Sequence, residues 1–112
     1  MSIQFSIIEK QSVSIVKLQG KILSELDLEE VKHKMEGLSN NRVVFELSEL
    51  THTNSSGIAF LIRIMTRSRI NDGDVVLASP NVGIQKLIDI SKLYEVFSIY
   101  NSLDEAVSHF IK

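Results

Sequence analysis

The sequence predicts a mixed α/β fold, with a mostly parallel five-stranded sheet and about four helices in a single domain spanning residues 1–112. Short apolar runs with the length of strands alternate along the chain with segments whose apolar residues recur at helical spacing. Such alternation requires right-handed crossovers, which make a sheet mostly parallel. The first two strands are separated only by the polar residues 9–12, too few for a crossover, so we expect this pair to be antiparallel.

The predicted strands are short runs rich in β-branched and other apolar residues. The run at 43–47 is almost continuously apolar, which is typical of a central strand covered on both faces. In the second run apolar side chains fall on both sides, so periodicity does not decide its buried face. The five runs span residues 3–8, 13–19, 43–47, 74–79 and 96–100.

The predicted helices each follow a residue that can cap a helix N-terminus. Ser24 can cap the first helix, Ser79 with Pro80 at the first helical position the third, and Ser102 opens a capping box at the fourth. The second is expected to follow a polar loop at 51–57. The expected buried stripes are Leu28, Val31, Met35 and Leu38; Ile58, Leu61, Ile62 and Met65; Ile84, Leu87 and Ile88; and Leu103, Ala106, Val107 and Phe110.

Composition excludes several classes of function. The chain has no cysteine, which rules out disulfides and thiolate metal sites, and its net charge of -2 provides no basic field for nucleic acid. The N-terminus lacks the features of a secretion signal, and no apolar stretch is long enough to cross a bilayer. We therefore expect a cytoplasmic protein with no direct membrane insertion and no nucleic-acid partner, and we assign no cofactor or metal.

The most informative segment is the loop between the third strand and the second helix. It brings Ser55 and Ser56 to a helix start, where unpaired backbone N–H groups and a partial positive charge favour an anion. Asn54 or Ser55 would cap this helix, and Gly57 would let another surface come close. An ordinary helix cap has the same pattern, so this segment alone does not establish a functional site.

Three motifs taken together resemble the STAS domain, a family named for sulfate transporters and anti-sigma factor antagonists. They are Ser55-Ser56-Gly57 after the Glu46–Leu50 strand end, the run Val75–Val82 and the run Leu87–Leu93. The resemblance implies a regulatory protein that controls transcription by binding an anti-sigma factor that is also a serine kinase. It also implies that this partner phosphorylates Ser55, or less readily Ser56, and that the phosphate releases the partner.

The sequence departs from the family pattern at two places near this serine. Asn54 stands where the family commonly has aspartate, and Gly20-Lys21-Ile22-Leu23 stands where it commonly has Gly-Glu-Leu-Asp. Loss of the carboxylates reduces repulsion of a phosphate on Ser55, and Lys21 would attract one if it is close. The expected partner-binding residues around the acceptor are Lys21, Asn54, Ser55, Ser56 and Gly57.

Two further residues of the second helix are candidates for partner binding. Phe60 and Ile64 lie nearly opposite the expected buried stripe, with Arg63 and Arg67 beside them. If this face is open, it forms an apolar and basic patch next to Ser55. The alternative is that a neighbouring element covers Phe60 and Ile64.

Other functions stay open as alternatives to a phosphorylation switch. The domain could be an unphosphorylated accessory subunit of a membrane-transport ATPase or of a larger signalling complex. A serine-dependent enzyme is disfavoured, since His52 precedes Ser55 but no Gly-x-Ser-x-Gly elbow or third triad member can be named. We therefore expect no enzymatic activity. The sequence leaves open whether the free chain is a monomer or a weak dimer.

Overall fold

The computed structural model describes residues 3–111, and its elements alternate as the sequence predicts. Two 3₁₀ helices, η1 and η2, supplement the four α-helices. In chain order the elements are β1 (Gln4–Lys10), β2 (Val13–Lys21), η1 (Glu25–Leu28), α1 (Glu29–Met35), β3 (Arg42–His52), α2 (Ser55–Ile70), β4 (Asp74–Ala78), α3 (Val82–Ser91), η2 (Leu93–Glu95), β5 (Ser98–Tyr100) and α4 (Leu103–Ile111).

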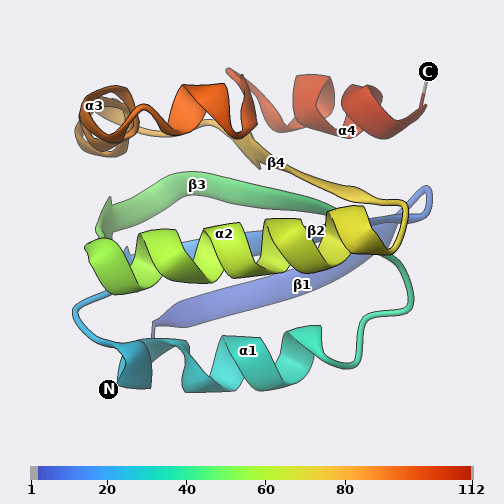
Figure 1. The fold of residues 1–112 in the computed structure, drawn as a ribbon, viewed down its shortest axis with the longest axis horizontal. Helices are drawn as coiled ribbons and strands as arrows, with labels where there is room; N and C mark the ends of the chain where they lie inside the picture. Colours follow the sequence, from blue (N-terminus) through green and yellow to red (C-terminus); the bar gives the residue numbers. More distant parts are fainter. Residues whose placement is uncertain (1–2, 112) are drawn as a thin grey trace.

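The strands form one sheet in the order β1-β2-β3-β4-β5 (Figure 1). β1 and β2 are antiparallel and the other neighbours are parallel, which confirms the predicted mixed α/β class. The turn between β1 and β2 is shorter than expected: Gln11 and Ser12 alone form it, with φ of 54° and 65°. Two consecutive positive φ angles are characteristic of the turn that matches the twist of a hairpin.

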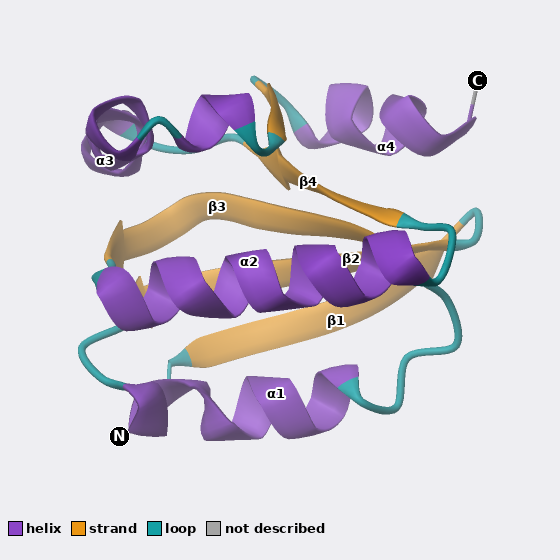
Figure 2. Cartoon of the chain, viewed as in Figure 1, coloured by secondary structure: helices purple, strands orange, loops and turns teal. Residues whose placement is uncertain are grey.

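Helices lie on both faces of the sheet (Figure 2). Residues of α1, α2 and α3 share one apolar core with Val16, Leu18, Phe45 and Leu77, whereas α4 packs against Val13, Ile15, Val44 and Val76 on the other face. The second strand is thus buried on both faces, which its periodicity had left undecided.

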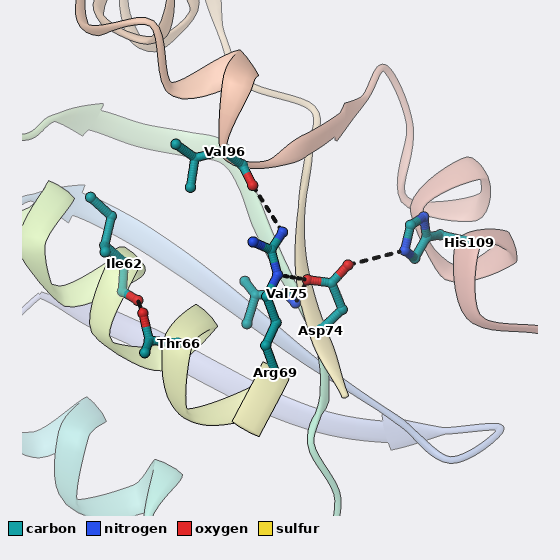
Figure 3. A network of polar contacts seen from close by, with 7 residues as sticks. All are labelled: Ile62, Thr66, Arg69, Asp74, Val75, Val96 and His109. Atoms are coloured by element: carbon teal, nitrogen blue, oxygen red, sulfur yellow. Dashed lines mark hydrogen bonds and ion pairs between the residues drawn. The ribbon is translucent and has the colours of Figure 1, made fainter. Parts of the chain in front are cut away.

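A polar network centred on Asp74 fixes α4 relative to the rest of the fold (Figure 3). Arg69, near the end of α2, places its Nε 2.9 Å from Asp74 Oδ1 and donates from Nη2 to the Val96 carbonyl at 2.9 Å. His109 of α4 lies 3.4 Å from the other Asp74 oxygen, and its Nδ1 is 2.8 Å from the Tyr100 hydroxyl. The Asp74 carboxylate of β4 therefore joins side chains of α2 and α4, and His109 extends the network to Tyr100 of β5.

The start of the third helix differs from the sequence prediction. Asn81, not Ser79, is the N-cap of α3, because its Oδ1 accepts a hydrogen bond from Ile84 N at 3.0 Å. Its amide also donates to the Leu50 carbonyl at 2.6 Å, which anchors the helix to β3. Ser79 instead takes a left-handed conformation with φ of 54°, and Pro80 precedes the helix.

The expectation of an open patch at Phe60 and Ile64 is wrong, since their exposed fractions are 1% and 4%. The buried residues of α2 are Gly57, Phe60, Leu61, Ile64, Met65 and Ser68, which recur every three or four residues. The Phe60 ring packs edge-on against Phe45 with 5.8 Å between centroids. Ile58 and Ile62 are only half-buried at the margin of this stripe, so Phe60 and Ile64 belong to the core and not to a partner-binding surface.

The turn between α2 and β4 leaves no room for a side chain at Gly73. A Cβ there would lie 1.9 Å from the carbonyl oxygen of Asn41, which accepts a hydrogen bond from Asp74 N at 3.0 Å. Relief requires movement of the backbone, so we expect Gly73→Ala to lower the free energy of unfolding by about 1 to 3 kcal/mol in urea titrations.

The matched control is Gly83→Ala in α3, where the nearest atom to the new Cβ is 3.6 Å away. Its free energy of unfolding should be unchanged or higher by up to about 1 kcal/mol, because alanine favours a helix. Equal stabilities of the two variants would contradict this account of the turn.

Candidate functional site

The loop at the end of β3 leads directly into α2, whose first residue is Ser55. Asn54 has an extended backbone, and its Oδ1 accepts hydrogen bonds from Ser56 N at 3.0 Å and Gly57 N at 3.3 Å. Of the two possible caps, the structure therefore selects Asn54. This leaves the Ser55 side chain free of a capping role.

The Asn54 side chain also joins two loops at this edge of the sheet. Its Nδ2 donates to the Leu23 carbonyl at 2.8 Å, next to the backbone hydrogen bond from Ile22 N to His52 O at 2.9 Å. The chain that leaves β2 thus runs beside the loop before α2. Asp27 Oδ2 in turn accepts hydrogen bonds from the backbone N–H groups of Leu23 and Ser24, at 2.8 and 3.1 Å.

We expected Gly57 to allow close approach of a partner. Gly57 is instead buried, so the close approach that it allows is to other residues of the same chain. A Cβ at this position would lie 2.0 Å from Thr53 Oγ1 and 3.3 Å from Ile22 Cδ1. The surface that approaches Gly57 is therefore the chain's own loop and the residue after β2.

Ser55 is exposed at the N-terminus of a helix of 16 residues. Within the described part of the chain its hydroxyl makes no hydrogen bond. Ser56 is half-buried beside it. The first turn of α2 contains no acidic residue, so the partial positive charge of the helix end is not neutralised from within that turn.

Within residues 3–111, the two strands that lead to the loop carry an unpaired lysine and a Lys–Glu ion pair. Lys21 is exposed at the end of β2 and lies opposite His52 in the parallel register. Glu49 is held by Lys17, whose Nζ is 2.5 Å from its Oε2, and this hydrogen bond lowers the pKa of Glu49 and raises that of Lys17. The Glu49 charge is therefore compensated, whereas Lys21 has no ion pair among the described residues.

His52 has its hydrogen-bond partner in Thr51. Its Nδ1 lies 3.1 Å from Thr51 Oγ1, and that hydroxyl donates to the Gly20 carbonyl at 3.0 Å. In the described residues no hydrogen bond joins His52 to Ser55, and no cluster of three or more His, Asp or Glu is arranged to hold a metal. No helix among residues 3–111 combines the length and apolarity needed to span a bilayer.

Exposed apolar residues near the loop before α2 were not predicted from the sequence. Leu23 and Leu26 are large and exposed, and Leu23 is joined to the loop through its carbonyl. Leu23 also lines a hollow of about 410 Å³, together with Ile3, Gln4, Gln19, Gly20, Lys21 and Asp27. The spacing of Leu23 and Leu26 before a helix gave no signal, because exposure depends on how that helix packs.

The chain matches a family model and is similar in fold to several solved structures. The family model of the STAS domain matches residues 4–106. A candidate anti-sigma factor antagonist from Thermotoga maritima superposes with a TM-score of 0.80 at 18% identity, covering 96% of this chain and 95% of that chain. An anti-sigma factor antagonist from Mycobacterium paratuberculosis gives a TM-score of 0.78 at 20% identity, covering 99% and 96%.

The anti-sigma factor antagonist SpoIIAA is similar in two states. Its unphosphorylated form gives a TM-score of 0.75 at 17% identity, covering 96% of this chain and 95% of that chain. The phosphorylated form from Bacillus gives 0.70 at 18% identity, covering 96% and 98%. At these identities the likeness to each solved structure establishes a shared fold.

Substitution of Asn54 tests how much its hydrogen bonds contribute to the stability of the loop and of α2. Asn54→Ala removes both the cap and the hydrogen bond to Leu23, so we expect the free energy of unfolding to fall by about 1 to 2 kcal/mol. Asn54→Ser keeps a capping oxygen and should recover about half of that loss. Asn101→Ala, whose exposed side chain makes no hydrogen bond in the described structure, serves as control and should match the wild type.

Proposed function

The chain belongs to the STAS domain family, and on that premise we propose that it is a regulatory protein-binding switch of the anti-sigma factor antagonist kind. We propose that its partner is an anti-sigma factor with serine kinase activity, and that the partner phosphorylates Ser55. The unphosphorylated domain binds the partner in the cytoplasm, which frees a sigma factor for transcription. Phosphorylation ends the interaction.

The observation that carries this proposal is the Ser55 hydroxyl, exposed and without a hydrogen bond in the described structure. A kinase can reach such a group without disturbing the fold, because Asn54 and not Ser55 caps the helix. Ser56 is a weaker acceptor candidate, since it is half-buried and follows the capped turn.

The local charges support tolerance of a phosphate at Ser55. Phosphorylation adds roughly 1.5 to 2 negative charges, and a helix N-terminus stabilises a nearby anion by about 0.3 to 2 kcal/mol. No acidic residue in the first turn opposes it, and Asn54 replaces the aspartate common in the family. SpoIIAA has been solved both with and without its phosphate in a fold similar to this one, which supports a switch that leaves the architecture in place.

The same phosphate would strongly affect a partner that covers the loop. Burying the added charge costs several kcal/mol unless the partner supplies a compensating group. A cost of about 3 kcal/mol weakens a complex by roughly a hundredfold. One modified side chain is therefore sufficient to end binding through the surface formed by Lys21, Leu23, Asn54 and Ser55.

An unphosphorylated accessory subunit, of a membrane-transport ATPase or a larger signalling complex, is the alternative function. It is favoured by Asn54 and Lys21–Leu23, which stand where the resemblance leads us to expect acidic residues that a kinase would recognise. Phosphopeptide mapping of the protein from its native cells separates the two. Phosphate on Ser55 under at least one growth condition supports the switch, and its absence under all of them supports the subunit.

The switch further predicts the behaviour of a phosphate mimic. With the partner identified by cross-linking in native cells and then purified on its own, calorimetry should show that Ser55→Asp weakens binding by about a hundredfold. Ser55→Ala should bind within about threefold of the wild type.

The matched control is Ser12→Asp, which adds the same charge at an exposed turn residue at the opposite end of β2. It should bind as the wild type does. Equal affinity of Ser55→Asp and Ser12→Asp would exclude Ser55 from the interface.

A further inference from the structure

A groove runs between α4 and the part of the sheet that α4 leaves uncovered. It has a volume of about 390 Å³, and most of its lining side chains are aliphatic. Figure 1 shows the end of α4 and the β1–β2 hairpin on the same side of the molecule. The aliphatic residues of the groove are Ile8, Ile15, Leu103, Val107 and Ile111.

The aliphatic residues that line this groove are continuous with one of the two apolar cores. Ile15 and Val107 belong to the core cluster beneath α4. Ile8, the register partner of Ile15, is 59% exposed on the edge strand β1, and Ile111 at the end of α4 is 43% exposed. Apolar side chains therefore extend from the core beneath α4 to Ile8 and Ile111 at the surface.

The rims of the groove carry opposite charges. Lys10 lies where β1 ends, and Asp104 lies in the first turn of α4. Neither side chain forms an ion pair within the described part of the chain. A surface with an apolar centre and one charge of each sign on opposite walls is complementary to a copy of itself.

We propose that this groove binds a second copy of the chain about a two-fold axis that crosses it. Ile8 and Ile111 of each copy pack against the groove of the other, and Lys10 of each copy meets Asp104 of the other. An interface of this kind is isologous, because the same patch is used on both sides and the assembly closes at two copies.

The dimer is independent of the proposed switch. Ser55 begins a helix whose buried side packs on the opposite face of the sheet from α4, so both copies keep Ser55 open. Stable dimers bury about 800 Å² on each partner, and a groove in which only Ile8 and Ile111 are exposed large apolar residues provides only part of that area. The expected dimer is therefore weak, with a dissociation constant of about 10 µM to 1 mM.

Sedimentation equilibrium of the full chain at low salt tests the apolar part of the interface. The wild type should change from monomer to dimer as its concentration rises from about 10 µM to 1 mM. Ile8→Lys and Ile111→Lys should each raise the dissociation constant at least about tenfold, since each places a charge in the apolar contact between the two copies. The control is Ile90→Lys on α3, where the side chain is 81% exposed outside the groove, and it should have no effect.

Exchanging the charges of Lys10 and Asp104 tests the two-fold symmetry of the proposed dimer. Lys10→Asp and Asp104→Lys each place like charges opposite each other in the dimer and should each weaken it about fivefold. In a mixture of these two variants both contacts are again of opposite charge, so a heterodimer should form about as tightly as the wild-type dimer. Fraying of α4 cannot explain such recovery, because the mixture contains the same Asp104→Lys chain.

Three outcomes would overturn the proposal. The first is a wild type that remains monomeric throughout the concentration range. The second is a dimer that Ile8→Lys and Ile111→Lys leave intact. The third is a charge-exchange mixture that associates no better than its components. Urea unfolding of each variant confirms that the compared chains are folded.

Discussion

The burial of β3 on both of its faces is the constraint from which the rest of the structure follows. Val43, Phe45 and Leu47 face the core shared with α1, α2 and α3, and Val44 faces the core under α4. A strand of this kind requires helices on both sides, and helices that return the chain to a parallel strand make all these strands end at one edge. The loop that carries Ser55 lies at that edge because β3 ends there.

The order and type of the elements could be predicted from the sequence because the periodicity of apolar residues reports burial directly. The errors arose where a tertiary contact decides a local structure. Ser79 and Pro80 have the form of a helix start, but Asn81 also reaches the Leu50 carbonyl on β3, and this contact fixes it as the cap. No pattern of neighbouring residues contains that hydrogen bond.

The exposure of Ser55 at a helix start agrees with the sequence prediction, and the error at α2 has a simple physical cause. Counting only large apolar residues centres the buried stripe on Ile58, Leu61 and Ile62. The helix instead turns Gly57 and Ser68 toward the sheet, since small residues allow close approach, and this rotation carries Phe60 and Ile64 inside. Ser55 was recognisable from its place before a helix, whereas the exposure of Leu23 and Leu26 depends on the packing of η1 and α1.

The strands lie in the sheet in the same order in which they occur in the sequence. No strand has to be inserted between two that are already paired, so the sheet can grow at one edge as the chain leaves the ribosome. Within residues 3–111 the hairpin of β1 and β2 is the only local pairing, and each later strand adds to the exposed edge of its predecessor. Each parallel pairing therefore joins two strands that are consecutive in the sequence, so the chain between them need be no longer than one crossover.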